Sequence, residues 1–153
     1  MIENRYTIKF GADFRVFEFD SEGPKGRIRK IVQYTEINVK DFYNLGFGDK
    51  NSLTNQIDDL IVTNNNDSQK VLATVAATLL EFTNHHPDSF VMAIGSALAR
   101  TRLYRIGISN NLKEIEKSFL IYGLKDKSWH RFERDINYEA FLVQRKKINF
   151  VKL

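Results

Sequence analysis

The sequence predicts an α+β domain in which antiparallel strands at both ends of the chain pack on two or three central helices. Aromatic and β-branched segments with strand character occupy the first and last thirds, whereas the middle shows the 3.6-residue period of helices. The 153 residues contain no repeat or Pro/Gly/Ser-rich linker, and 12 Phe, six Tyr and one Trp supply apolar surface for one core. We therefore expect a single domain over residues 1–153, ordered over about residues 5–147.

The first third is typical of antiparallel strands joined by turns. Gly11-Ala12-Asp13 predicts a hairpin-like turn, and the stretch from Ser21 to Gly26 is the strongest turn signal, with one of the two prolines. Alternation of Ile28, Val32 and Tyr34 predicts a longer strand after that turn. We expect strands, in order, over residues 6–10, 14–19, 28–34, 42–47 and 57–62.

The period changes after the polar loop 63–68, which supplies N-cap residues for a helix beginning near Ser68. The apolar residues of this segment cover more than one helix face, so we expect it to be buried on both sides and to end at His86-Pro87. A short buried strand over 90–94 should follow. Gly95-Ser96 then turns into a second helix that Gly107 interrupts near its end, and a short third helix begins at Asn110 or Asn111.

Strands return in the last third, over residues 119–124, 129–132 and 138–143, and the basic residues 145–147 end the ordered region or form an edge. The order of elements, strands then helices then strands, favours α+β over alternating α/β.

Composition excludes several classes of protein. With no cysteine, disulfide frameworks, zinc ribbons, iron–sulfur clusters and thiol catalysis are excluded. No N-terminal signal peptide or membrane-spanning run is present, so we expect a soluble, cytoplasmic protein without membrane contact. The formal net charge is +4, but residues 1–80 carry −1 and residues 81–153 carry +5. This asymmetry indicates either an anionic partner, such as nucleic acid or phosphate, or an ordinary solvated basic surface.

The main candidate site is the segment from Gly95 to Arg105. Ser96 is placed to cap the second helix, whose first backbone N–H groups would attract an anion. Arg102 and Arg105 lie three residues apart and share a helix face, and arginine suits bidentate contact with phosphate.

Two further residues of this segment complete the candidate ligand-binding set. Tyr104 would stack on a base. Arg100 is two residues from Arg102, about 200° around a helix, so the three arginines grip one phosphate only if the helix begins late. An amphipathic helix with exposed arginines and an ordinary Ser cap explains the same residues without a ligand.

Secondary candidates are Asn44 and Asp49, beside two glycines, and the neighbouring His85 and His86. Asn44 and Asp49 either bind a ligand or form a turn, which is the commoner use of Asn, Gly and Asp. The histidines either act as acid–base groups or cap the helix end. No metal site and no cofactor are expected, since no metal-ligand spacing or nucleotide-binding loop is present.

Four segments resemble a bacterial protein family of unknown function: Ser21–Gly26, Tyr43–Asp49, Lys70–Ala76 and Ala99–Arg105. The closing segment 137–143 also fits, so the resemblance spans most of the chain, from about Tyr6 to Lys147. The resemblance implies that the domain is complete, and it assigns a catalytic role to no residue of this sequence. Compact bacterial proteins of this kind are often toxin–antitoxin or defence components.

Two functions remain in view. The first is a nucleic-acid- or phosphate-binding protein, in the form of an RNA-acting toxin-like or defence effector. The second is a non-catalytic protein-interaction module, as a homodimer or with another protein, favoured by aromatic richness and by the strand edges at both ends of the chain. The sequence does not decide whether the protein is an enzyme.

Overall fold

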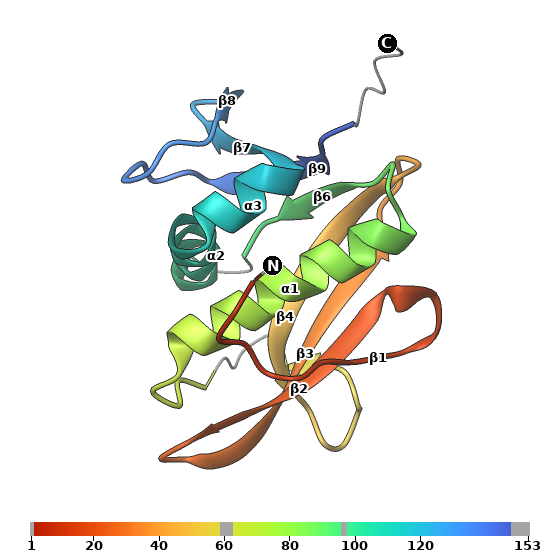
Figure 1. Cartoon of the computed structure of the whole chain (residues 1–153), viewed down its shortest axis with the longest axis vertical. Coiled ribbons are helices and arrows are strands. Elements are labelled where there is room, and N and C mark those ends of the chain that lie inside the picture. Colours follow the sequence, from red (N-terminus) through yellow and green to blue (C-terminus); the bar gives the residue numbers. More distant parts are fainter. Residues whose placement is uncertain (1, 59–62, 96–97, 148–153) are drawn as a thin grey trace.

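The computed structural model describes residues 2–58, 63–95 and 98–147, and within them the chain is α+β (Figure 1). The N-terminal elements are β1 (Lys9–Phe10), the 3₁₀ turn η1 (Ala12–Phe14), β2 (Val16–Gly23), β3 (Gly26–Glu36), β4 (Phe42–Lys50) and β5 (Ile57–Asp58). The central elements are α1 (Ser68–His85), β6 (Phe90–Ala93), α2 (Leu98–Asn110) and α3 (Leu112–Ser118). The last are β7 (Phe119–Lys125), β8 (Ser128–Arg131) and β9 (Ala140–Arg145). The α+β prediction is confirmed.

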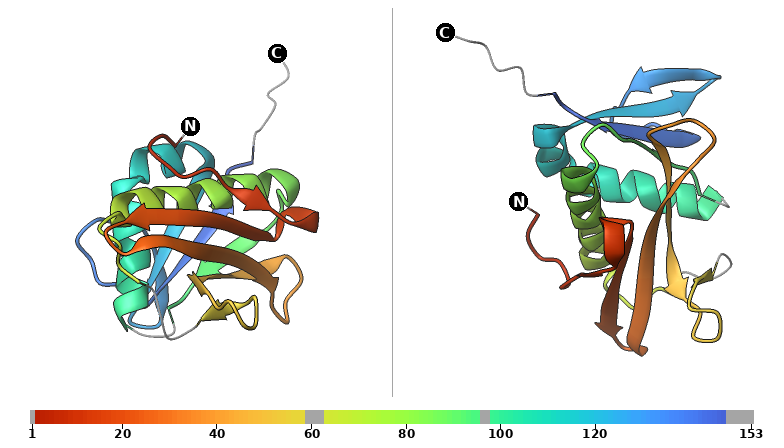
Figure 2. Two further views of the ribbon diagram at one scale, coloured as in Figure 1. Left: turned by 90° about the horizontal axis from the view of Figure 1, so that it is seen from below. Right: turned by 90° about the vertical axis from the view of Figure 1, so that its right-hand side faces the viewer.

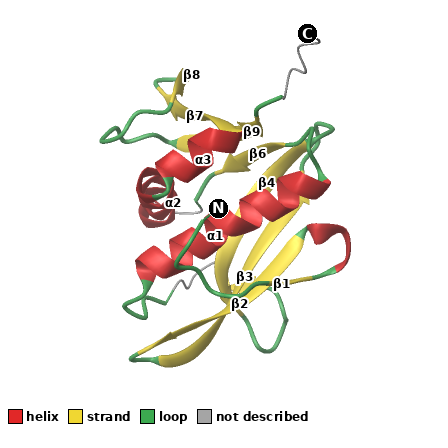
Figure 3. Cartoon of the chain, viewed as in Figure 1, coloured by secondary structure: helices red, strands yellow, loops and turns green. Residues whose placement is uncertain are grey.

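All described strands belong to one nine-stranded mixed sheet, in the order β1-β2-β3-β4-β6-β9-β7-β8, with β5 paired to β4 (Figure 3). The two ends of the chain therefore do not form separate antiparallel sheets with edges of their own. The join is a parallel pairing of β4 with β6, in which Tyr43 lies opposite Val91. This pairing was not expected, because it connects strands on opposite sides of α1 in the sequence.

The side chains of alternate strand residues face α1, as a half-buried strand requires. In β3 the inward positions include Val32 and Tyr34. The Tyr34 ring stacks on Phe82 of α1 with centroids 4.2 Å apart, and its hydroxyl forms a 2.8 Å hydrogen bond with that of Thr78. Residues 71–79 of α1 are all buried, so the predicted burial of this helix on both sides is confirmed.

The helices α1 and α2 meet where Gly107 lies against Leu72. A Cβ atom added at Gly107 would lie 3.3 Å from Leu72 Cδ2, closer than most real contacts. The expectation that Gly107 interrupts its helix is wrong: α2 continues to Asn110, and the glycine instead lets the two helices approach closely. Figure 2 shows the helices on one side of the curved sheet. None of the described helices is long and apolar enough to cross a lipid bilayer.

Candidate anion-binding site

The helix α2 separates the arginines that the sequence grouped together. Arg100 and Tyr104, four residues apart, are buried, at 9% and 5% exposure. Arg102 is exposed and Arg105 half-buried on another side of the helix. Positions 100 and 102 are about 200° apart around the helix, so Arg100 does not share a face with the other two arginines. A site on the exposed face can therefore contain Arg102 and Arg105 but not Arg100. Ser96 lies outside the described residues.

Tyr104 is a core residue, which contradicts its predicted role of stacking on a base. Burial raises its pKa to about 12, and its hydroxyl oxygen accepts a hydrogen bond from the backbone N–H of Phe47, which lowers the pKa by a smaller amount. A side chain that is only 5% exposed cannot present its ring to a base at the surface. Arg100 lies close enough to Tyr104 to affect its ionisation, so both residues belong to the interior between α2 and the sheet.

Arg102 and Arg105 line an open hollow of about 1010 Å³. One wall is α2, and the other is the segment between β8 and β9, which lies beside α2 in Figures 1 and 2. The polar side chains around this hollow belong to the following residues: Thr101, Arg102, Arg105, Asn137, Tyr138 and Glu139. The two arginines that share a helix face thus face one space, and the facing segment adds an amide and a carboxylate.

Tyr138 fixes the wall opposite α2. Its ring lies on the backbone of Gly123 in β7, where a Cβ atom would be 2.3 Å from the ring. Its hydroxyl accepts a 3.0 Å hydrogen bond from the Glu133 backbone N–H and lies 3.4 Å from the Arg131 carbonyl. These contacts tie both ends of the β8–β9 segment together. Arg134 extends the tie to α2, donating to the Ser109 carbonyl at 3.1 Å.

Gly95 positions the other wall. Its backbone N–H donates a 3.1 Å hydrogen bond to the Thr101 hydroxyl. A Cβ atom at Gly95 would lie 2.3 Å from the Thr101 backbone nitrogen, so only glycine lets the chain pass this close to α2. The prediction that Gly95 leads from a strand into a helix is confirmed, and this approach orients the face that carries Arg102.

The charges around the hollow suit an anion. Two guanidinium groups face one carboxylate, that of Glu139, which leaves an excess of one positive charge. One guanidinium group can donate two parallel hydrogen bonds to the oxygens of a phosphate. The side chains of Asn137 and Glu139 can accept hydrogen bonds from hydroxyl or amino groups. Among the residues that the structure describes, no three His, Asp or Glu side chains gather into a group that would hold a metal ion.

The secondary candidates Asn44 and Asp49 do not form one site. They are five residues apart on β4 and therefore point to opposite faces of the sheet. Asn44 lies opposite Thr35 and Met92, whereas Asp49 points inward. Between them, Gly46 allows a close approach, because a Cβ atom there would lie 3.1 Å from the Ile57 side chain.

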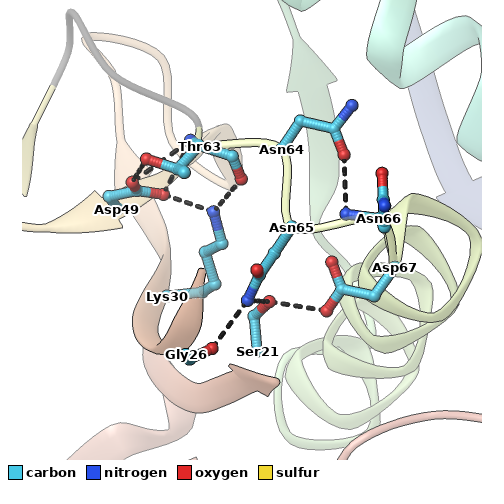
Figure 4. A network of polar contacts seen from close by, with 9 residues as sticks. All are labelled: Ser21, Gly26, Lys30, Asp49, Thr63, Asn64, Asn65, Asn66 and Asp67. Atoms are coloured by element: carbon cyan, nitrogen blue, oxygen red, sulfur yellow. Dashed lines mark hydrogen bonds and ion pairs between the residues drawn. The ribbon is translucent and has the colours of Figure 1, made fainter. Parts of the chain in front are cut away.

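Asp49 forms a buried ion pair with Lys30, whose side chain is 1% exposed (Figure 4). The Lys30 ammonium also donates to the Thr63 carbonyl at 2.9 Å. Asp49 accepts further hydrogen bonds from the Thr63 backbone N–H and hydroxyl, at 3.1 and 2.5 Å. Lys30 is not among the residues expected at a site, although it alternates along β3 with Val32 and Tyr34 and this alternation places its side chain inward.

A second polar cluster ties the β2–β3 turn to the start of α1 (Figure 4). Buried Asn65 donates to the Gly26 carbonyl at 2.8 Å and accepts from the Lys25 N–H at 2.7 Å. The Asp67 carboxylate accepts from the hydroxyls of Ser21 and Tyr6, at 2.5 and 2.6 Å. The polar loop expected to cap α1 therefore anchors a hairpin instead: Asp67 is the N-cap residue but makes no side-chain cap hydrogen bond.

His85 and His86 attach η1 to the end of α1. The His85 ring stacks on Phe14, with centroids 3.5 Å apart, and its Nδ1 lies 3.0 Å from the Glu81 carbonyl. His86 Nε2 lies 2.7 Å from the Asp13 carbonyl, and its ring stacks on Phe82. His86 ends α1 as its C-cap residue, as expected. The contacts of both rings are with protein groups at this junction, which accounts for them without acid–base chemistry.

Comparison with known proteins gives a family but no characterised relative. No curated protein and no solved structure matches the chain significantly. A family of unknown function, DUF6934, matches residues 2–146, which is nearly the whole chain and confirms the resemblance seen in the sequence. The chain therefore belongs to the DUF6934 family.

Proposed function

We propose that this protein binds single-stranded RNA in the hollow between α2 and the β8–β9 segment, with Arg102 and Arg105 contacting phosphate. One observation carries the proposal. Two arginines lie three residues apart on α2, and both line the same hollow. Arginine is the side chain best suited to bind phosphate, because its planar guanidinium group donates two parallel hydrogen bonds to neighbouring phosphate oxygens.

The opposite wall supports RNA over inorganic phosphate alone. A volume of about 1010 Å³ is far larger than one phosphate requires and accommodates a nucleotide with its neighbours. The side chains of Asn137 and Glu139 can accept hydrogen bonds from a ribose 2′-hydroxyl or a base amino group. A ligand that offers both phosphate and these donors would use both walls.

The charge distribution supports the same proposal. Residues 81–153 carry a net charge of +5 while residues 1–80 carry −1, and the described residues that line the hollow all belong to the later part. A local positive field raises the encounter rate with a polyanion and makes binding weaken with salt.

Fluorescence anisotropy with a labelled single-stranded RNA of about ten nucleotides tests the proposal. The wild type should bind, and Arg102→Ala/Arg105→Ala should bind at least tenfold more weakly, because each charged hydrogen bond contributes about 1.5–3 kcal/mol. A control variant, Lys9→Ala/Lys25→Ala, removes two exposed charges from the N-terminal half and should change affinity by less than about twofold. Equal RNA binding by all three proteins would refute the proposal.

A toxin-like or defence role belongs to the same proposal. If RNA is the target in the cell, induced expression in a bacterial host should slow growth, and Arg102→Ala/Arg105→Ala should restore it. Normal growth with abundant wild-type protein would remove this role while leaving RNA binding in vitro untouched.

A second candidate function is self-association through β8. This strand ends the sheet, all four of its residues are exposed, and Trp129 is 40% exposed. Within the described part of the chain β8 pairs with β7 alone, and an edge of this kind can pair with the same strand of another copy. Light scattering tests it: a dimer that Trp129→Lys converts to a monomer supports the interaction module, and a monomeric wild type contradicts it.

A further inference from the structure

A cavity of about 60 Å³ lies in the core, where the three helices meet the sheet (Figure 1). Its wall is formed by α1, α2, α3 and the strands β4, β6 and β9. Of the described residues that line it, Ala93 and Ile108 are half-buried and the others are buried. Spaces larger than a water molecule are uncommon in protein interiors, which are packed as densely as organic crystals. This cavity is therefore a feature of the core that calls for an occupant.

The surface of the cavity is almost entirely apolar. Among the described residues that line it, Tyr104 is the one with a polar side chain, and its hydroxyl oxygen is already bonded to the backbone N–H of Phe47. A water molecule inside a protein needs two to four polar partners, which this lining does not supply. A polar or charged ligand would lose its hydrogen bonds with solvent on entering and would not regain them. The lining therefore selects for an apolar occupant.

The volume restricts the size of that occupant. An apolar cavity of about 150 Å³ binds benzene, which has six carbon atoms, and cavities of this kind also bind xenon. In proportion, a cavity of about 60 Å³ holds about two or three carbon atoms or one xenon atom. An occupant would restore to the lining side chains the dispersion contacts that a cavity denies them.

The cavity adjoins the contact between α1 and α2. Gly107 and Leu72, whose close approach joins the two helices, both line it. Arg102 and Arg105 line the outer hollow instead, and none of the described residues lines both spaces. An occupant would therefore add contacts between the helices without touching the two arginines.

We propose that this cavity binds a small, uncharged, apolar molecule of up to about three carbon atoms, such as a short hydrocarbon, or an apolar gas atom of similar size. The proposal does not depend on RNA binding, because the two sites share no described residue. Binding stabilises the folded protein, because the unfolded chain has no such cavity.

Methyl NMR of the whole protein under increasing xenon pressure tests the site. We expect saturable shifts at the methyl groups of Ala76, Ile115 and Val143, which line the cavity. The methyl groups of the exposed Val39 and Leu53 should show none. Benzene at the same free concentration should cause no saturable shift, because it needs about 150 Å³. Absence of saturable xenon shifts at the lining methyl groups, or benzene binding as tight as that of xenon, would overturn the proposal.

A partly filled cavity tests the location. Val143→Ile adds one methylene at the wall of the cavity and should weaken xenon binding at least about tenfold. It should also raise the urea midpoint by about 0.3–0.5 M, because a buried methylene stabilises the fold. The matched change Val39→Ile, at a residue that is 55% exposed, should leave xenon binding within about twofold and the midpoint unchanged.

Arg102→Ala/Arg105→Ala should also leave xenon binding unchanged, so failure of this site is distinguishable from failure of RNA binding. Unaltered xenon binding by folded Val143→Ile would place xenon elsewhere and overturn the proposal. A urea midpoint for Val143→Ile below that of the wild type would also overturn it, because the wall would then have no room for an added methylene.

Discussion

The ring of Tyr138 lies on the backbone of Gly123, so close that a Cβ atom there would be 2.3 Å from the ring. This contact holds the β8–β9 segment in place opposite Arg102 and Arg105. The wall of the candidate site therefore depends on a glycine in a neighbouring strand that touches no ligand.

Gly123→Ala should displace Tyr138 and loosen this wall. We expect a loss of about 1–3 kcal/mol in the free energy of unfolding, as for other overpacked sites, together with weaker RNA binding. Urea denaturation and anisotropy measure the two effects. Gly11→Ala is the control, because a Cβ there meets only the Val16 carbonyl at 3.9 Å. Stability and binding equal to those of the control would show that Tyr138 does not need this contact.

Breaking the buried ion pair should be costly. Lys30→Met leaves the Asp49 carboxylate buried without its cation, and such changes typically cost about 3–5 kcal/mol. Denaturation in urea should show this loss, whereas Lys25→Met, at an exposed position, should change stability by less than about 0.5 kcal/mol. A loss below about 1 kcal/mol for Lys30→Met would mean that the pair is not buried as described.

Acid should weaken an ion network on the outer face of the sheet. Hydrogen bonds from Arg29 lower the pKa of Asp20, so this carboxyl stabilises the folded state above its unfolded pKa of about 3.9. The contribution is lost as pH falls through the lower, folded pKa. Because the pair is partly exposed, Asp20→Asn should cost less than about 1 kcal/mol at pH 7, and the difference should shrink as the pH falls below about 4. A difference that is constant from pH 7 to pH 2 would contradict this linkage.

Removing the carboxylate from the hollow should strengthen phosphate binding. Glu139 lines the same space as Arg102 and Arg105, and its charge repels an anion. A unit charge several ångströms away in water contributes roughly 0.5 kcal/mol, so Glu139→Gln should bind RNA about two- to threefold more tightly at low salt. Glu133→Gln, in the same segment but outside the hollow, should have a smaller effect. Glutamine keeps a hydrogen-bond acceptor at this position, so the substitution removes only the repulsion between the carboxylate and phosphate. Weaker binding by Glu139→Gln would contradict this prediction, because it would show that the negative charge strengthens the contact with RNA by more than it repels phosphate.

The regular elements could be predicted because their causes are local. The apolar periodicity of residues 71–82 and the position of Pro87 located α1, and the turn from Ser21 to Gly26 located the β2–β3 hairpin. The parallel pairing of β4 with β6 could not be predicted in this way. It depends on the path of the chain through α1, and no residue in either strand specifies its partner.

The candidate site was predicted in part. Helix geometry correctly separated Arg100 from Arg102, but the burial of Tyr104 follows from the packing of α2, which the sequence does not show. The facing wall, Asn137 to Glu139, comes from a segment more than 30 residues away and was missed. Lys30 was missed because a lysine is ordinarily a surface residue. Its position in the alternation of β3 nevertheless places its side chain among the inward-facing ones.

The salt dependence of RNA binding tests the central claim most directly. Each phosphate contact in a single strand contributes about 0.7 to the slope of log K against log salt concentration. If Arg102 and Arg105 each contact one phosphate, Arg102→Ala/Arg105→Ala should bind with a slope that is shallower by about 1.4, while Lys9→Ala/Lys25→Ala keeps the wild-type slope. Identical slopes for the wild type and the arginine variant would contradict the claim that this hollow holds the RNA backbone.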